Sequence, residues 1–392
     1  MIRACKVKLG RAPKQEAKLR RVLGLCCALY NAALQQRREA WQRQRVSLSF
    51  YEQCKELTQL RSDDDDYRNL PAQMTRVTVL HRLDKAFHGF FRRVKRGEKP
   101  GFPRFRSWER FDTLTFTTQD WHIDGKKLVL NVRKDPIVFQ MRNTIYREGE
   151  IKGLRIVRGA TRWWAHFLVD IGPAPTLKKS STGVGIDVGL RTFATMSDGT
   201  QIEHPRFLRK SIDKLRESGQ SVSHKRKGSR NRGKAKLVLA RAHEKIANRR
   251  RNFIHQTVAT LVKRYDGFAV EKLNVQEMSS TEHEPDEMTK KGARGLRRGI
   301  MDSGWTMFGT HLAAKAEEAG LPFVRVNPRG TSQRCSGCGS VVRKTLRDRT
   351  HYCAACGLVM DRDENAARNI YDLGRRSATG DARVEGAEVS SE

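Results

Sequence analysis

Apolar residues in the first hundred positions recur at three- and four-residue steps, the pattern of helices with one buried face. A long helix is predicted to begin near Pro13 and end near Arg45, and its packing face comprises Leu19, Leu23, Cys26, Cys27, Tyr30 and Leu34. A second helical run is predicted over residues 73–94. The acidic segment 63–66 between them is interpreted as a solvated loop rather than a cation site. Residues 3–9 alternate in polarity, which is typical of an edge strand.

Beyond residue 107 the pattern changes to short β-like segments separated by turns, which predicts a small β domain or barrel. Its strands are expected at residues 113–117, 127–132, 151–157 and 163–171. The segment 173–182 is rich in Pro, Lys and Ser and is interpreted as a linker.

An α/β domain is predicted to follow this linker, because apolar strands again alternate with helical patterns. Two strands joined by a tight glycine turn open it within residues 184–200. Further strands are expected at 267–273 and 322–326, and helices at 303–319 and 363–373. Residues 377–392, rich in Ser, Gly and Glu, are expected to be disordered.

The charge of the chain indicates a polyanionic partner. It has 77 Lys and Arg against 43 Asp and Glu, a formal net charge of +34, and basic side chains that contact phosphates bind nucleic acid in a salt-dependent way. Residues 206–251 hold 17 of the basic residues against 3 acidic ones, in two predicted helices. The contacts expected from these helices are Lys225, Arg226, Lys227, Arg230, Lys234, Arg241, Lys245 and Arg249.

The sequence has no apolar run of membrane-spanning length, and its first residues lack the features of a signal peptide. A cytoplasmic protein without membrane contact is therefore expected. Of the eight cysteines, four are scattered and are interpreted as buried thiols: Cys5, Cys26, Cys27 and Cys54.

Two acidic residues stand where a buried strand would ordinarily carry an aliphatic side chain. Asp187 lies inside the apolar run 184–189, and Glu271 ends the apolar run 268–271. A buried carboxylate is costly unless a cation compensates it. Either residue alone could be an ion-paired strand acid, but together in one α/β domain they favour a function. Carboxylates that hold two Mg²⁺ ions roughly 3.5–4 Å apart can hydrolyse a phosphodiester.

A third carboxylate is offered by the start of the last predicted helix, by Asp361 or by Asp363. Asp361 has capping-box spacing with Glu364, although Ser or Thr is the usual first residue of that motif. Asp363 falls in the first helical turn and can project towards the sheet edge. We therefore predict that Asp363 is the metal ligand and that Asp361 is the cap.

Four cysteines form two Cys-x-x-Cys pairs with the spacing of a zinc ribbon: Cys335, Cys338, Cys353 and Cys356. Four thiolates close a tetrahedral site, so a structural zinc ion is predicted. The loop between the pairs is basic enough to contact phosphate, although a merely solvated loop is equally compatible with it; its basic residues are Arg343, Lys344, Arg347, Arg349 and His351.

The glycines of residues 183–189 superficially resemble a nucleotide-binding loop. Such a loop leads into a helix, whereas residues 192–196 continue as a second strand. An actin-like ATPase can also begin with this kind of hairpin, but the charge of the chain and the cysteine pairs argue against that class.

Taken in order, these motifs resemble the TnpB family of transposon-associated, RNA-guided DNA endonucleases. They are Gly-Ile-Asp-Val-Gly, Val-Glu-Lys-Leu, Ser-x-Arg-Cys-x-x-Cys-Gly, Cys-x-x-Cys-Gly and Asp-Arg-Asp-Glu-Asn-Ala-Ala-Arg-Asn-Ile. Shorter flanking pieces also resemble it: Phe90-Phe-Arg-Arg-Val-Lys, Gly101-Phe-Pro-Arg-Phe-Arg, Lys225-Arg-Lys-Gly-Ser and Ser303-Gly-Trp. The resemblance covers nearly the whole chain.

The resemblance implies a multidomain α/β fold. A wedge-like β-barrel domain (residues 1–12 and 108–178) would be split around a helical recognition lobe (13–107). An RNase H-like, or RuvC, nuclease domain (179–328 and 358–376) would follow, with a zinc ribbon (329–357) that binds target nucleic acid. Asp187, Glu271 and Asp363 would be its catalytic, Mg²⁺-binding triad.

The resemblance also implies a guide RNA transcribed from the transposon end, and a short motif read beside the double-stranded DNA target. A transposase could be encoded nearby. By position, the residues facing the motif would be Phe50, Gln73, Thr75, Arg76 and Val77.

We therefore expect a magnesium-dependent DNA endonuclease directed by RNA. Three alternatives remain open from the sequence. A compact type V CRISPR effector would share the triad and the ribbon. A guide-directed DNA-binding regulator would have lost cleavage, and an RNA-binding protein of ribosomal type would not depend on magnesium.

Overall fold

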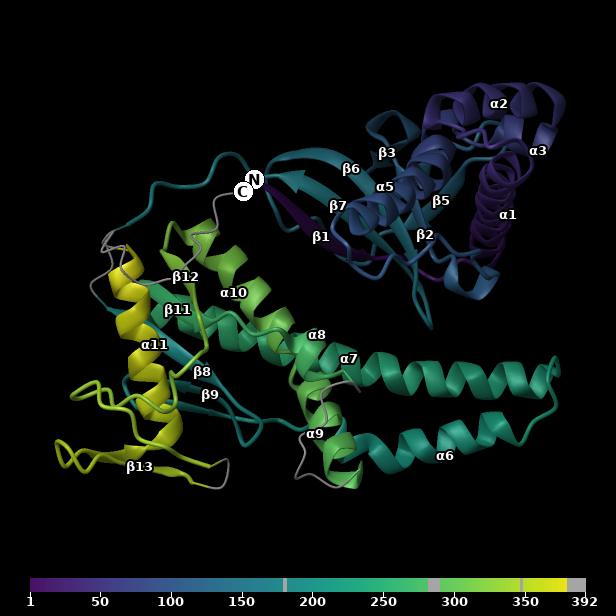
Figure 1. The fold of residues 1–392 in the computed structure, drawn as a ribbon. Coiled ribbons are helices and arrows are strands. Elements are labelled where there is room, and N and C mark those ends of the chain that lie inside the picture. The colour runs from purple at the N-terminus through teal and green to yellow at the C-terminus, as the bar shows by residue number, and fades with distance from the viewer. Residues whose placement is uncertain (179–181, 281–289, 346–347, 379–392) are drawn as a thin grey trace. The chain divides into compact units, whose positions relative to one another are not determined.

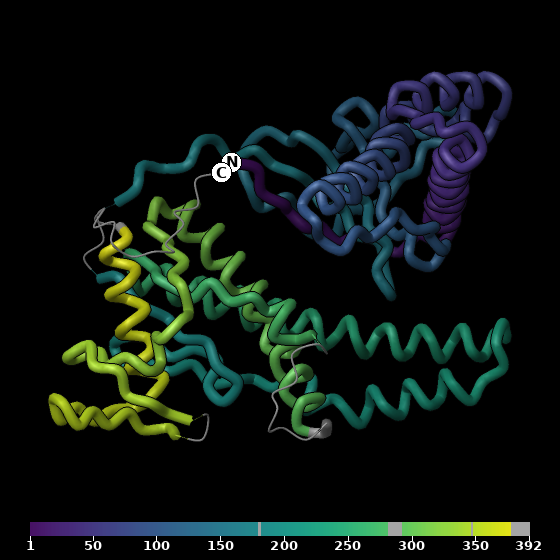
Figure 2. The backbone as a smooth tube through the Cα atoms, viewed as in Figure 1, coloured from purple at the N-terminus to yellow at the C-terminus, as the bar shows by residue number. Residues whose placement is uncertain are grey.

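The break predicted after the β segments is also a break in the tertiary structure. In the computed structural model the chain divides into two units, Met1–Pro173 and Ala174–Glu392, drawn as a ribbon in Figure 1 and as a tube in Figure 2. The structure describes residues 1–178, 182–280, 290–345 and 348–378. Residues 179–181 of the predicted linker, and residues 379–392 of the tail predicted to be disordered, lie outside the described residues.

Helices fill the middle of the first unit. They are α1 (Pro13–Gln44), α2 (Phe50–Asp63), α3 (Asp65–Asn69), α4 (Ala72–Thr75), a π-helical turn (Arg76–Leu80) and α5 (His81–Lys95). The predicted first helix is confirmed: Pro13 occupies its first turn, where a missing N–H costs no hydrogen bond, and Arg45 ends it in a left-handed conformation with φ of 56°. The second predicted run is continuous, but a π-helical turn interrupts its α-helical geometry.

The prediction that the acidic segment 63–66 is a loop was wrong. Asp63 is the last residue of α2, and Asp64 caps α3 by accepting hydrogen bonds from the backbone N–H groups of Asp66 and Tyr67, at 2.7 and 3.3 Å. Asp65 and Asp66 lie in the first turn of α3, where the helix dipole favours negative charge. These aspartates therefore define the ends of two helices.

Two antiparallel sheets complete the first unit. One has the order β1-β7-β6-β2 and the other the order β3-β4-β5. Their strands are β1 (Ile2–Lys8), β2 (Thr113–Phe116), β3 (Trp121–Asp124), β4 (Lys127–Leu130), β5 (Ile137–Gln140), β6 (Glu150–Arg158) and β7 (Trp163–Asp170). As predicted, β1 is an edge strand. Inward residues such as Phe116 and Phe167 share one hydrophobic core with Leu23 and Tyr30 of α1, so strands and helices of this unit stabilise each other.

The second unit is built on one mixed sheet with the order β10-β9-β8-β11-β12. Its strands are β8 (Gly183–Val188), β9 (Thr192–Met196), β10 (Gln201–Glu203), β11 (Gly267–Glu271) and β12 (Phe323–Val326). β8, β11 and β12 are parallel, whereas β9 and β10 run antiparallel to their neighbours. The predicted strands of the α/β domain are confirmed, and all three parallel strands end at the same edge.

The helices of this unit are α6 (Ile212–Ser223), α7 (Arg230–Arg264), α8 (Val275–Met278), α9 (Lys290–Ser303), α10 (Trp305–Ala319) and α11 (Arg362–Ala378). Ser377 and Ala378 belong to α11, so the prediction of disorder was wrong for these two residues. In Figure 1, α6 and α7 lie side by side as a hairpin that projects from the sheet. Among the described residues, no helix has the length and apolar character needed to cross a membrane.

Helix α11 packs very close to the sheet, because a glycine occupies the contact on each side: Gly185 in the sheet and Gly374 in the helix. A Cβ atom on Gly185 of β8 would lie 2.1 Å from the backbone oxygen of Ala367 and 2.5 Å from the backbone nitrogen of Tyr371. A Cβ atom on Gly374 of α11 would lie 2.4 Å from that of Ala269 in β11. Only hydrogen fits at these contacts, so the two glycines fix how closely α11 approaches β8 and β11.

Candidate active site and metal centre

Asp187 and Glu271 lie at the carboxyl ends of neighbouring parallel strands. β8 pairs with β11 with Ile186 opposite Val270, so the next residue on each strand, Asp187 or Glu271, reaches the same sheet edge. Neighbouring strands are about 4.8 Å apart, and open α/β sheets bind ligands outside the carboxyl ends of their strands. The tertiary structure thus joins two acids that are far apart in the sequence.

Helix α11 begins at this edge and adds the third carboxylate. Asp361 Oδ1 accepts hydrogen bonds from the backbone N–H groups of Asp363 and Glu364, at 2.8 and 3.2 Å. Asp361 is therefore the N-cap of α11, the role that its position in the sequence suggested. Asp363 lies in the first turn of the helix, on the side of the sheet where its charge acts on Asp187.

The pKa shifts show that these carboxyl groups share one environment. Burial, followed by the negative charges of Glu271 and Asp363, raises the pKa of Asp187 well above its ordinary value. Burial also raises the pKa of Glu271 and of Asp363, the latter with help from the charge of Asp361. Three cations, Arg349, Arg362 and Arg191, partly offset this rise in the pKa of Asp363. Carboxylates that resist ionisation in this way are relieved by a bound cation.

Thr331 is a member of this site that the sequence did not reveal. Its hydroxyl is buried and donates a hydrogen bond of 2.6 Å to Oε1 of Glu271, with the oxygen of Pro328 at 3.0 Å. This bond lowers the pKa of Glu271 against the larger effect of burial. Thr331 precedes the Ser-x-Arg-Cys motif by one residue, and nothing in its local sequence distinguishes it from a surface threonine.

The carboxylates are spread more widely than the ligands of a single metal ion. Among the described residues, the four clustered cysteines are the one group of three or more His, Cys, Asp or Glu whose ligand atoms all lie within 4.8 Å of one another. Two ions held roughly 3.5–4 Å apart require carboxylates on both sides of the pair. Asp187, Glu271 and Asp363 therefore do not form a preformed single-ion cluster in this structure.

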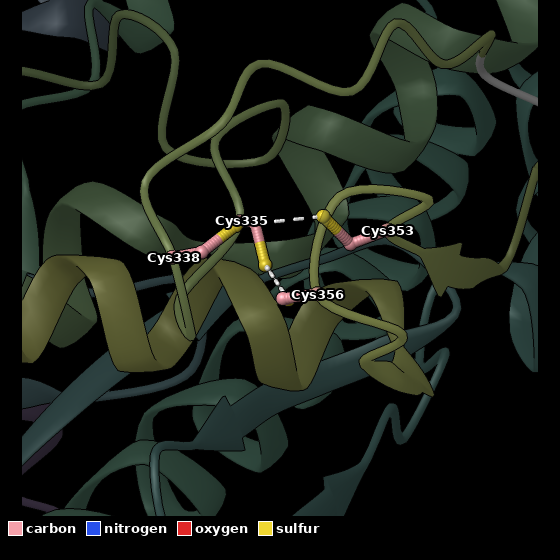
Figure 3. A group of neighbouring side chains, drawn as sticks. All are labelled: Cys335, Cys338, Cys353 and Cys356. Carbon is pink, nitrogen blue, oxygen red and sulfur yellow. Dashed lines mark hydrogen bonds between the residues drawn. The ribbon is translucent and has the colours of Figure 1, made fainter.

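The four cysteines converge as predicted (Figure 3). The Sγ atoms of Cys335 and Cys356 are 3.7 Å apart, and those of Cys338 and Cys353 are 3.6 Å apart. Four sulfurs at about 2.3 Å from a tetrahedral zinc ion are roughly 3.8 Å from each other, so the thiols fit that ion. Hydrogen bonds with Ser340, Cys356 and Cys353 lower the pKa of the Cys338 thiol to about 6. A backbone hydrogen bond at Leu358 lowers the pKa of the Cys356 thiol, but hydrogen bonds with the other cysteines, together with burial, raise it to about 12. The metal-free cluster therefore holds protons that zinc binding would release.

Two asparagines of α11 attach the cysteine ribbon to this helix. Asn365 Oδ1 accepts the backbone N–H of Ser336 at 2.9 Å, and its Nδ2 donates to the backbone oxygen of Arg334 at 2.8 Å. Asn369 Nδ2 donates to the oxygens of Thr331 and Arg334, at 2.8 and 2.7 Å. Both side chains are buried. The same helix therefore carries Asp363 and fixes the loop that carries Thr331.

The loop between the cysteine pairs ends in β13 (Thr350–Tyr352), which pairs with β14 (Val359–Asp361) on the far side of the second cysteine pair. His351 is fully buried, so its side chain is not available for the phosphate contact that was one of the two open interpretations of this loop. Lys344 is half-buried, and its Nζ donates to the oxygen of Ser332 at 2.7 Å. Arg347 lies outside the described residues. Among the loop residues that the structure describes, Arg343 and Arg349 carry exposed positive charge.

The basic residues predicted on the second unit's hairpin gather along α7. Five of them are exposed and are spaced so that they share one side of the helix: Arg230, Lys234, Arg241, Lys245 and Arg249. We call this set the α7 stripe; it is about 28 Å long at 1.5 Å per residue. Arg226 and Lys227 are exposed in the turn before α7, whereas Lys225 Nζ donates to the side chain of Ser221 at 3.0 Å.

The five residues predicted to face a DNA motif surround the π-helical turn, but they differ in accessibility. Arg76 is exposed, and Gln73 and Val77 are half-buried. Phe50 is half-buried, with its ring 6.0 Å from that of His81. Thr75 is completely buried and donates its hydroxyl to the oxygen of Pro71 at 2.9 Å. The predicted contact of Thr75 is therefore wrong, because its side chain is used within the fold.

Three family models match the chain. One described as "Probable transposase" matches residues 166–282, one described as "Cas12f1-like, TNB domain" matches residues 305–370, and one described as "Helix-turn-helix domain" matches residues 1–45. The second match contains the cysteine ribbon. In the third, the structure has β1 followed by the single unbroken helix α1 (Pro13–Gln44).

Relatives match over almost the full length. A Streptomyces pristinaespiralis protein named as an RNA-guided DNA endonuclease is 30% identical over 390 residues, 97% of this chain and 91% of the relative. A protein of Escherichia coli (strain K12) named as the RNA-guided DNA endonuclease InsQ is 27% identical over 379 residues, 95% of this chain and 92% of the relative. A solved structure of "the mini-RNA-guided endonuclease CRISPR-Cas_phi3" shares the fold with a TM-score of 0.55 at 9% identity, covering 95% of this chain and 92% of that one.

Proposed function

Because the chain belongs to the TnpB family of RNA-guided DNA endonucleases, we propose that it cleaves double-stranded DNA at sites selected by a guide RNA, using Asp187, Glu271 and Asp363. The observation that carries this proposal is the convergence of these three carboxylates from β8, β11 and α11 at one sheet edge. The strand order, with three antiparallel strands followed by two parallel ones, supports an RNase H-like nuclease domain.

The proposed cofactor of this site is a pair of Mg²⁺ ions. When bound, such ions polarise the scissile phosphate and activate the attacking water. The chain's contribution is to hold the carboxylates before the metal arrives. Thr331 restrains Glu271, and the close contact at Gly185 sets the position of the helix that carries Asp363. The site therefore selects for oxygen-seeking cations through ligand type and spacing.

Asp363, rather than Asp361, is the third proposed ligand. One oxygen of Asp361 already accepts two backbone hydrogen bonds at the start of α11. Moving it towards a metal would leave those amides without their cap, at a cost of about 1 kcal/mol. Asp363 does not cap the helix, and burial raises its pKa as it raises that of Asp187.

The proposed nucleic-acid partners are the guide RNA from the transposon end and the DNA target with its adjacent motif. The α7 stripe would follow a phosphate backbone, and Arg76, Gln73, Val77 and Phe50 would face the motif. A structural zinc ion would hold the cysteine ribbon against the nuclease sheet. The prokaryotic cytoplasm, where such a target lies, is the proposed location, and a transposase encoded nearby is a further proposed partner, in transposition.

The test is a cleavage assay with the protein co-purified with its native RNA. Plasmids that carry the guide-matched target beside randomised flanks are incubated in magnesium, and cut products are sequenced. We expect cleavage next to one short motif, loss of cleavage in chelator, and no cleavage by Asp187→Ala, which should still bind target. A wild-type complex that binds its target and leaves it intact in magnesium would instead be a guide-directed DNA-binding regulator, and the nuclease proposal would be rejected.

A further inference from the structure

One motif of the sequence has no role in the proposed cleavage site. The segment Gly101-Phe-Pro-Arg-Phe-Arg lies across the first unit's helices and forms one wall of a groove of about 1280 Å³, whose other walls come from α1 and α5. Four aromatic side chains line it and are largely exposed: Trp41 by 53%, Phe91 by 57%, Phe102 by 44% and Phe105 by 46%. We call this the aromatic groove. A groove that gathers several exposed aromatic side chains is a candidate binding site.

The walls of the aromatic groove are held in place before any ligand binds. The Phe102 ring packs edge-on against Phe87 and Phe90, with centroid distances of 5.6 and 5.2 Å. Arg93 Nη2 donates to the oxygen of Gly101 at 2.9 Å. Asn31 of α1 pairs with the backbone of Arg106, accepting its N–H at 2.8 Å and donating to its oxygen at 2.9 Å. A ligand would therefore bind without first ordering the groove.

The charge around the aromatic groove has one sign. Its charged lining residues, among those the structure describes, are Arg37, Arg38, Lys99 and Arg104, with no acidic side chain. Arg37 is paired with Asp84 at 3.3 Å, and Arg38 stacks over the Phe105 ring at 5.3 Å. Lys99 and Arg104 are exposed at the rim. Flat aromatic faces bordered by cations are the combination that binds unpaired nucleotides, by base stacking and by phosphate contacts.

We propose that the aromatic groove binds an unpaired segment of the guide RNA, an inference that rests on the proposed function. A double helix hides its base faces, so the exposed rings require unpaired bases. A second copy of this chain is disfavoured as the occupant, because two aromatic grooves facing each other would bring their cationic rims together. A DNA target is present only transiently, whereas the guide RNA is a resident partner. The resident strand is therefore the one that can keep this apolar surface covered.

The direct test uses the full chain and the double variant Trp41→Ala/Phe105→Ala, which keeps every charge. A fluorescent oligouridine serves as the unpaired probe, and an RNA duplex of equal length as the paired one. We expect at least about tenfold weaker binding of the oligouridine, because one or two stacked bases lose their aromatic partners, with duplex binding nearly unchanged. Trp41→Phe retains an aromatic face and should bind like the wild type. Tyr146→Ala removes an aromatic residue that is 65% exposed outside the groove and is the matched control.

The guide complex identifies the occupant. The double variant should lose affinity for the native guide RNA, and ultraviolet cross-links to that RNA, mapped without DNA present, should include the Trp41 or Phe105 peptide. Equal losses for oligouridine and duplex would overturn the proposal. Normal guide binding with weakened target binding would also overturn it, because the groove would then bind a DNA strand. A wild-type dimer that the double variant fails to form would overturn it as well, because the groove would then be an interface between two copies of the chain. Plasmid cleavage by the wild type is scored separately, so failure of the nuclease proposal is distinguishable from failure of this one.

Discussion

Thr331 donates a 2.6 Å hydrogen bond from its hydroxyl to Oε1 of Glu271, which joins the loop before the first cysteine pair to the end of β11. Asn369 of α11 holds the same loop through the backbone oxygen of Thr331 at 2.8 Å. The ribbon, α11 and the sheet therefore meet at one carboxylate, and changes in the ribbon are expected to reach the cleavage site through this threonine.

Replacing Thr331 by valine should shift the pH dependence of cleavage. The hydroxyl lowers the pKa of Glu271, so its loss raises that pKa and moves the acidic limb of the profile to higher pH. A hydrogen bond to a charged group is worth roughly 1.5–3 kcal/mol, which corresponds to about one to two pH units. Cleavage rates measured across pH would show the shift. Thr331→Ser, which keeps the hydroxyl, should restore the profile; an unchanged profile in the valine variant would contradict the positioning role.

Asp187→Asn should abolish cleavage and yet stabilise the metal-free protein. The pKa of Asp187 in the folded state is raised above its ordinary value of 3.8, so the folded state holds a proton that the unfolded state releases. Stability is therefore lost as pH rises from the ordinary pKa to the raised one, by about 1.4 kcal/mol for each pH unit between those two values. Urea unfolding in chelator should show the variant to be more stable at neutral pH, with the difference shrinking in acid. A less stable variant at neutral pH would argue against the buried, repulsive site.

Gly185→Ala should displace α11. The added methyl group would collide with the backbone of Ala367 and Tyr371, and overpacking of this kind costs about 1–3 kcal/mol. Cleavage should fall further than stability explains, because Asp363 moves with the helix. Gly219→Ala in α6 is the control, since its added methyl group meets nothing within 4 Å; it should be neutral or slightly stabilising. Equal behaviour of the two variants in thermal unfolding would contradict the close-contact interpretation.

Loss of the ribbon metal should impair cleavage as well as folding. Cys353 is buried and its Sγ lies 3.6 Å from that of Cys338, so Cys353→Ser should eliminate bound zinc, measured by elemental analysis as about one ion per wild-type chain. The loop that carries Thr331 would then be less restrained. We expect lower thermal stability and slower cleavage at saturating magnesium. Full activity in a zinc-free variant would show that the ribbon does not support the carboxylate site.

Neutralising the α7 stripe should weaken nucleic-acid binding and make it less dependent on salt. For Lys234, Arg241 and Lys245 changed together to alanine, the slope of log affinity against log salt should fall by up to about 0.7–0.9 for each phosphate that is no longer neutralised. Lys126→Ala, an exposed cation on the first unit, should leave the slope unchanged. Binding titrations at several salt concentrations measure the slope for both variants. An unaltered slope in the triple variant would show that the phosphate backbone of the nucleic acid does not contact the α7 stripe.

Much of the site followed from local sequence. A carboxylate inside an apolar strand, as at Asp187, and paired Cys-x-x-Cys motifs are informative because burial makes an uncompensated acid costly and because thiolate geometry fixes the spacing of a zinc site. The capping role of Asp361 was also predictable, because it depends on backbone amides two and three residues away. The prediction for segment 63–66 failed since helix ends and loops favour the same acidic residues.

What the sequence determined by itself was therefore the chemistry available: acids in strands, cysteine pairs, a strongly basic surface and the periodicities of the elements. Only the tertiary structure decided which of these groups meet. The Thr331–Glu271 bond, the burial of Thr75 and His351, and the aromatic groove depend on contacts between segments far apart in the chain. Local sequence carries no record of them, because a side chain's partners are set by how whole elements pack rather than by its neighbours along the backbone.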